Sequence, residues 1–100
     1  MYKIERLTVK ERIEIPVGAV CEIPVNEVID VEYGTNDYST NYATVHLRKS
    51  LAVKGLIQAI HTPFPEGKHE NPKVVVYNKH VAPISLNYGD EIASIWIFTQ

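Results

Sequence analysis

Hydrophobic and polar residues alternate with a period of two along most of the chain. This alternation is typical of strands that bury one face and expose the other. Residue choice points the same way, because 12 Val, 11 Ile and 6 Thr stand against 5 Leu and 6 Ala, and branched side chains favour a pleated sheet. We expect nine strands, at residues 2–9, 12–17, 19–23, 27–33, 41–48, 56–60, 73–78, 82–86 and 91–98.

Pro, Gly, Asn and Asp cluster in the breaks between these segments. Their short, even spacing predicts an all-β fold, a distorted barrel or a sandwich. Only residues 49–54 lack a strand pattern, so we expect one short helical turn there, ended by Gly55. Polar loops are expected at 34–41 and 61–72, and loops of such length inside a small domain tend to carry function.

The last expected strand, 91–98, is apolar on both faces. One face would carry Ile92, Trp96 and Phe98, and the other Ala93, Ile95 and Ile97. A strand of this kind needs cover on both sides. A central place in a closed barrel and contact with another subunit both supply it, and the pattern does not choose between them.

Length and charge limit the classes of protein that fit. One hundred residues make a single domain, 1–100, with a small core, which favours assembly into oligomers. A formal net charge of −2 is not that of a nucleic-acid binder. No apolar run approaches the roughly 20 residues of a membrane span, and residues 1–6 have no apolar signal core. We therefore expect a soluble, cytoplasmic protein.

Reactive side chains show no spacing typical of a metal or nucleophile site. The four histidines, at 46, 61, 69 and 80, form no metal-ligand pair, and Ser50 has no base beside it in the sequence. Cys21 is single, which fits a reducing compartment and a small buried side chain. We predict no metal and no catalytic residue. His61 is set apart only by its place where a strand enters the long loop.

Two cations and a hydroxyl precede the expected helical turn, at Arg48, Lys49 and Ser50, and Lys54 ends it. Cationic side chains beside the first amides of a turn can hold an anion such as a phosphate. An ordinary connection between two strands, with solvated charges, explains the same residues equally well.

This segment resembles the second motif of the dUTPase and dCTP deaminase superfamily, approximately R-S-S/G-L-A-x-K-x-G-I/L, and the likeness continues in order over residues 12–98. Residues 60–67 are similar to the hairpin I-D-x-G-Y/F-x-G with one insertion, and 74–78 to the strand that ends in Asn. Residues 83–95 are similar to P-I/V-x-I/L-x-x-G-D/M-x-I-A/G-Q-I/L, and 15–27 to the passage that ends in threonine-x-glutamate. The second-motif matches are Arg48, Ser50, Leu51, Ala52, Lys54, Gly55 and Leu56.

The resemblance implies an all-β, dUTPase-like fold of the β-clip type, assembled as a homotrimer with nucleotide sites between subunits. Arg48, Lys49, Ser50 and Lys54 would then hold phosphates. Phe64 would offer a stacking face to a base or sugar, and His61 a polar contact.

The sequence departs from the family's motifs at the residues that carry the chemistry. His61 takes the place of the hairpin carboxylate of dUTPases, and Val75 that of the glutamate of dCTP deaminases. Lys49 replaces a phosphate-binding serine, Ser94 a glutamine and Glu91 an arginine. The opening G-x-D segment has no counterpart, and no Gly-rich arm is found before the sequence stops at residue 100. Tight Mg-triphosphate hydrolysis is therefore not expected.

The leading expectation is a catalytically degenerate dUTPase-like homotrimer that binds a nucleotide or a protein partner in a regulatory, sequestering or inhibitory role. No cofactor is expected, and Mg only together with a nucleoside triphosphate. The first alternative is an active, divergent dUTP pyrophosphatase or dCTP deaminase. The second is a structural β-clip trimer, such as a viral capsid decoration protein, which would be virion-associated.

Overall fold

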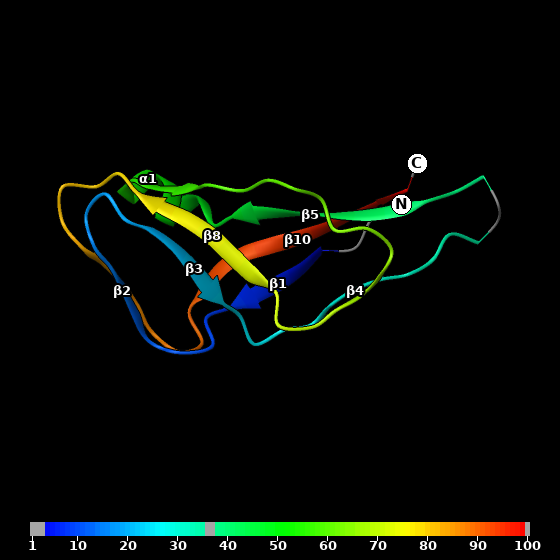
Figure 1. Cartoon of the computed structure of the whole chain (residues 1–100), viewed down its shortest axis with the longest axis horizontal. Coiled ribbons are helices and arrows are strands. Elements are labelled where there is room, and N and C mark those ends of the chain that lie inside the picture. Colours follow the sequence, from blue (N-terminus) through cyan, green and yellow to red (C-terminus); the bar gives the residue numbers. More distant parts are fainter. Residues whose placement is uncertain (1–3, 36–37, 100) are drawn as a thin grey trace.

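The computed structural model describes residues 4–35 and 38–99, which form ten strands and one helix (Figure 1). The strands are β1 (Ile4–Thr8), β2 (Ile13–Ile15), β3 (Val20–Pro24), β4 (Ile29–Val31), β5 (Asn41–Leu47), β6 (Leu56–Gln58), β7 (Gly67–His69), β8 (Lys73–Asn78), β9 (Ile84–Leu86) and β10 (Glu91–Thr99). The helix α1 spans Lys49–Lys54, as the sequence predicts. Each of the nine expected strands is present, most of them shorter; residues 2 and 3 lie outside the described part.

The sequence prediction missed one strand. β7 lies inside the segment 61–72, where we expected only a loop, and it pairs antiparallel with β4. Its three residues, Gly67 to His69, have no apolar alternation. Pairing with a distant strand therefore makes this segment a strand, and its own pattern does not.

The strands form four antiparallel ladders, in the orders β1-β10-β5, β2-β9, β3-β8-β6 and β4-β7. Over the described residues these ladders do not close into a barrel, so a closed barrel is the wrong explanation for the cover of the last strand. The two three-stranded sheets form a sandwich instead, with β3 and β8 crossing in front of β10 in Figure 1. The dUTPase-like all-β fold is confirmed in its sandwich form.

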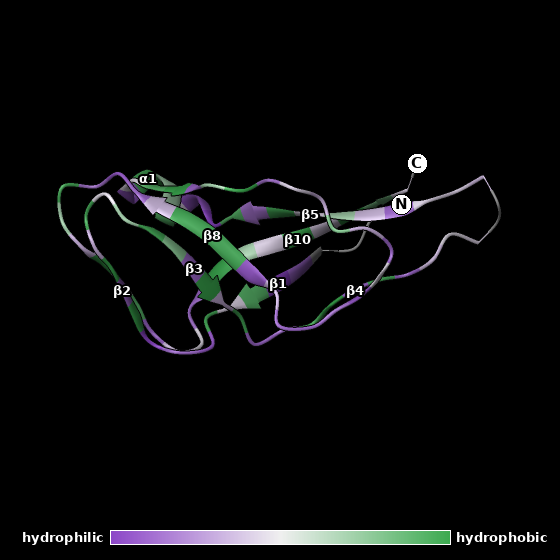
Figure 2. Cartoon of the chain, viewed as in Figure 1, coloured by the Kyte–Doolittle hydropathy of each residue, from purple (hydrophilic) through white to green (hydrophobic). Residues whose placement is uncertain are grey.

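The core lies between the sheets because inward-facing positions alternate with exposed ones. On β8, Val74 and Val76 are buried while Lys73 is exposed, and apolar residues colour the middle of this strand in Figure 2. From the opposite sheet, Leu7 and Ile95 are buried against the same core. Cys21, as expected, packs at its margin as a half-buried free thiol.

The last strand, β10, is the central strand of its sheet, between β1 and β5. Its inner face buries Ala93 and Ile95. On the outer face Trp96 and Phe98 are half-buried, and β5 covers them in part. The Tyr42 ring stacks on Phe98 at 5.5 Å between centroids. The apolar character of both faces is thus met partly within one chain.

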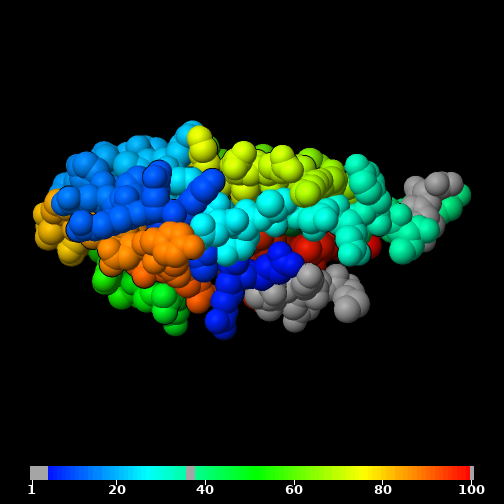
Figure 3. Space-filling view, turned by 90° about the horizontal axis from the view of Figure 1, so that it is seen from below, coloured from blue at the N-terminus to red at the C-terminus, as the bar shows by residue number. Residues whose placement is uncertain are grey.

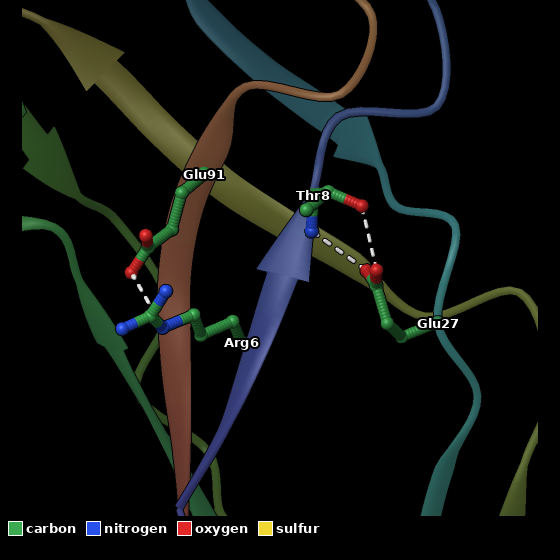
Figure 4. A network of polar contacts seen from close by, with 4 residues as sticks. All are labelled: Arg6, Thr8, Glu27 and Glu91. Atoms are coloured by element: carbon green, nitrogen blue, oxygen red, sulfur yellow. Dashed lines mark hydrogen bonds and ion pairs between the residues drawn. The ribbon is translucent and has the colours of Figure 1, made fainter.

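A carboxylate fixes the end of β1 (Figure 4). The Oε1 of Glu27 accepts a hydrogen bond from the Thr8 amide and its Oε2 one from the Thr8 hydroxyl, each at 2.6 Å. On the neighbouring strand, Arg6 lies 3.8 Å from Glu91. Glu27, which the sequence comparison placed in the threonine-x-glutamate passage, therefore has a structural contact. Within the described residues, no helix has the length and hydropathy needed to cross a membrane.

Candidate functional site

The four predicted phosphate ligands are exposed and lie on or beside α1. Arg48 is the residue that caps its N-terminus, and Lys49, Ser50 and Lys54 lie within it. Leu51 turns inward and is buried, which anchors the turn to the core. We refer to Arg48, Lys49, Ser50 and Lys54 as the cationic turn.

The backbone at both ends of the cationic turn is held by neighbouring segments. At its start, the amide of Arg48 donates to the carbonyl of Ile92 on β10 at 2.8 Å. At its end, the carbonyl of Gly55 accepts from the Lys79 amide at 2.9 Å. Gly55 has φ 110°, and a Cβ there would lie 3.1 Å from the His80 nitrogen. The turn is thus fixed between two strand ends.

Side-chain cations, more than backbone amides, give this turn its capacity for anions. The carbonyl of Arg48 already accepts hydrogen bonds from the Leu51 and Ala52 amides, at 3.0 and 3.2 Å. The first turn contains no acidic residue. Glu91, where the family motif has an arginine, lies on the strand that anchors Arg48. Its partner Arg6 offsets the negative charge there.

The hairpin of β6 and β8 encloses a cavity of about 280 Å³. Phe64 forms one wall, because its backbone pairs with Ala43 on β5 through two hydrogen bonds of 2.9 and 2.8 Å. Its ring meets the His69 ring edge-on at 5.1 Å. The lining residues are Val45, Gln58, Ile60, Thr62, Pro63, Phe64, Pro65, His69, Lys73, Val74 and Val75.

The structure brings Phe64 into this cavity but keeps the other predicted site residues outside its lining. His61 is exposed in the loop after β6, and the cationic turn lies beyond the opposite end of that strand. One chain therefore places its phosphate-binding candidates and its candidate ring-binding cavity in separate parts of the surface.

Sequence reasoning missed Gln58, which holds the cavity wall together. Its Oε1 accepts from the Leu47 amide at 3.1 Å, and its Nε2 donates to the carbonyls of Val45 and Ile60 at 2.9 and 3.1 Å. A polar residue in line with buried Leu56 on the inner face of a strand is the pattern that could have revealed it.

His69 was also not singled out. Its Nε2 lies 2.8 Å from the Pro65 carbonyl oxygen. A carbonyl can only accept, so Nε2 carries the proton and donates. This contact closes the loop from Pro65 to His69 over one side of the cavity.

The acidic residue of this loop, Glu66, is engaged in holding the backbone. Its Oε2 accepts from the Gly34 amide at 2.6 Å and from the Asn41 amide at 3.1 Å. Across the described residues, no three His, Cys, Asp or Glu side chains lie close enough together to hold a metal ion. The cavity thus offers apolar walls, an imidazole and an ammonium.

No protein-family model matches the sequence, and no curated protein matches it. Solved structures do. The dUTPase of Staphylococcus bacteriophage 80alpha superposes with a TM-score of 0.78 at 11% identity, over 98% of this chain and 89% of that one. The dUTPase from phage phi11 of S. aureus gives 0.73 at 10%, over 98% and 90%. The EIAV dUTPase gives 0.74 at 20%, over 98% and 88%. At these identities the likeness establishes a dUTPase-like fold.

Proposed function

We propose that this protein is a catalytically degenerate dUTPase-like homotrimer that binds a nucleotide at clefts between its subunits, in a regulatory, sequestering or inhibitory role. The observation that carries the proposal is the cationic turn: four exposed phosphate-binding side chains on a backbone segment that is fixed at both ends. Charge-assisted hydrogen bonds from such side chains are the strong contacts to a phosphate.

The positions where dUTPases and dCTP deaminases carry their acids support the degenerate part of the proposal. His61 cannot act as the anionic base that a carboxylate supplies, and Val75 has no proton to transfer. Glu66 is the nearest acid along the hairpin loop, and its carboxylate is already bound to two backbone amides. Phosphate binding survives this loss because it uses other residues.

The separation of the two half-sites within one chain supports a cleft between subunits. A nucleotide needs its phosphates and its ring held by one continuous surface, and one chain has the cationic turn outside the cavity lining. A second chain that brings its own cavity beside the turn would complete the site.

The structural neighbours support both the ligand class and the role. The 80alpha phage dUTPase was solved with dUpNHpp, and its description states that phage dUTPases control transfer of virulence genes. The phi11 protein is described with a structural Mg(II) ion. In this chain, Mg would enter with a bound nucleoside triphosphate.

The test is calorimetric titration with deoxynucleoside mono- and triphosphates, with and without Mg. Replacing Arg48 by Ala should weaken binding by about 1.5–3 kcal/mol, roughly 10- to 150-fold. Arg12, which is also exposed but lies between β1 and β2, is the matched control, and Arg12→Ala should leave affinity unchanged. Equal affinities for the wild type and Arg48→Ala would exclude this site.

A release assay separates the degenerate protein from an active one. Pyrophosphate and ammonia are measured over the four deoxynucleoside triphosphates with Mg. No turnover above background is expected. Turnover would establish the active alternative, and the absence of any nucleotide binding would favour a structural or protein-binding role.

A further inference from the structure

The outer face of the β3-β8-β6 sheet carries a row of apolar side chains. Val20 on β3 and Ile57 on β6 are both the register partners of Tyr77 on β8, so the three side chains lie side by side across the sheet. Val20 is 62% exposed and Ile57 43% exposed, and Tyr77 is half-buried. We call Val20, Ile57 and Tyr77 the apolar row.

The adjacent residues show that the apolar row points away from the core. The next row, Cys21, Val76 and Gln58, faces inward, and Val76 is completely buried. The row after that faces outward again and contains Val75, half-buried, opposite Glu22.

Polar groups border the apolar row on the same face. The Lys73 ammonium lies 3.3 Å from the Glu22 carboxylate at the other end of β3 and β8. In Figure 2 the corresponding end of β8 is hydrophilic, and the middle of the strand is hydrophobic. An apolar centre with a charged border is the usual composition of a protein interface.

The chain exposes more surface than its mass requires. A folded monomer of 11.3 kDa has an accessible surface of about 5,700 Å², and this chain has 6455 Å². Its extents of 49 × 20 × 18 Å give the elongated outline of Figures 1 and 3. The excess, about 700 Å², is close to the roughly 800 Å² that each partner buries in a stable interface.

We propose that the apolar row is the surface on which a second copy of this chain docks. The excess area favours a copy over a small ligand, because only a protein-sized partner covers a surface of that extent. The docked copy also bears on the candidate site. Val75 lies beside the row and lines the hairpin cavity, so the second chain would border the cavity opening. This inference rests on the proposed cleft between subunits and names the face that forms it.

The experiment measures molar mass by light scattering over a dilution series. Ile57→Glu and Val20→Glu are tested separately, since they lie on different strands and a charge at either should raise the dissociation constant for self-association at least tenfold. Val28→Glu is the matched control: Val28 is 41% exposed, nearly the same as Ile57, but it precedes β4 and lies outside this sheet. It should assemble like the wild type.

Circular dichroism first establishes that each variant is folded. If a variant fails to fold, hydrogen exchange of the wild type at low and high concentration gives the answer, and protection should rise with concentration in residues 20–22 and 56–58. A monomeric wild type, or unchanged assembly of both row variants, would overturn the docking face. So would protection confined to other segments, or equal disruption by Val28→Glu.

The same samples keep the two proposals distinct. If the wild type assembles and binds nucleotide while Ile57→Glu and Val20→Glu assemble normally, the cleft lies at another face and only this inference fails. If assembly depends on the apolar row but no nucleotide binds, the docking face stands and the nucleotide function fails.

Discussion

Replacing Gly55 by Ala tests whether the cationic turn is held where the structure places it. Gly55 follows α1 in a left-handed conformation, φ 110° and ψ 11°. Its amide donates to the Ala52 carbonyl at 3.1 Å, and its carbonyl accepts from the Lys79 amide at 2.9 Å. An added Cβ would meet the His80 nitrogen at 3.1 Å and the His80 Cα at 3.2 Å. These are backbone atoms, and they cannot rotate away.

The expected cost has two parts. A left-handed conformation costs an L-residue about 1–2 kcal/mol, and the close approach to His80 adds to it, so Gly55→Ala should destabilise the fold by about 2–3 kcal/mol. Gly89 separates the two parts, because it has φ 82° but no atom within 4 Å of its Cβ position. Gly89→Ala should therefore cost only about 1 kcal/mol.

Urea unfolding measures both variants, with stability read from the midpoint at constant slope. The prediction is a larger loss for Gly55→Ala than for Gly89→Ala. Equal losses would refute the reasoning, since they would mean that the approach to His80 contributes nothing and that the end of the turn is not fixed there. A loss at Gly89 alone would refute it too.

Three further changes test the contacts around the site by the same unfolding assay. Asn78→Leu should cost about 2–4 kcal/mol, because the buried amide donates to two backbone carbonyls and accepts from one backbone amide, which would be left unpaired. Glu27→Gln should cost about 1–3 kcal/mol by weakening its two bonds to Thr8; exposed Glu14→Gln should stay within about 0.5 kcal/mol. Phe64→Ala should cost about 2 kcal/mol, less than in a full core, since its ring is half-buried at the cavity wall.

Most of the fold could be predicted because its cause is local. The alternation at residues 73–78 gives β8 with the same bounds, and inward and outward positions alternate there as the pattern requires. The helical turn is found because residues 49–54 break the alternation and Gly55 accepts a conformation that other residues avoid. In both cases the information lies within a few residues of the element.

Long-range contacts account for what the sequence left out. β7 exists because Gly67–His69 pairs with β4, more than 30 residues away in the chain. Glu66 fixes the same region from its side chain, and its partners are backbone amides, which leave no trace in residue type. A backbone acceptor is available at every residue, so no spacing in the sequence identifies the one that is used.

The candidate site was predictable as separate pieces, and their arrangement was not. Exposed cations at Arg48 and Lys49 follow from their polarity. The cavity at Phe64 does not, since it depends on the pairing of Phe64 with Ala43 and on the bridge that Gln58 makes between β5 and the loop after β6. Distances within one chain then separate what the motif pattern joins.

The distribution of charges explains how this fold can keep ligand binding after losing chemistry. The carboxylates of Glu27 and Glu66 are engaged with the backbone and stabilise the ends of strands and loops. To serve as a base in place of the residue at His61, Glu66 would have to release the amides of Gly34 and Asn41, and the loop they hold would lose its anchor. The exposed cations have no such structural duty, because the cationic turn is held by its backbone and by Leu51. Binding can therefore vary with the charged side chains while the fold is maintained, whereas recovery of an acid at the cavity would cost stability elsewhere.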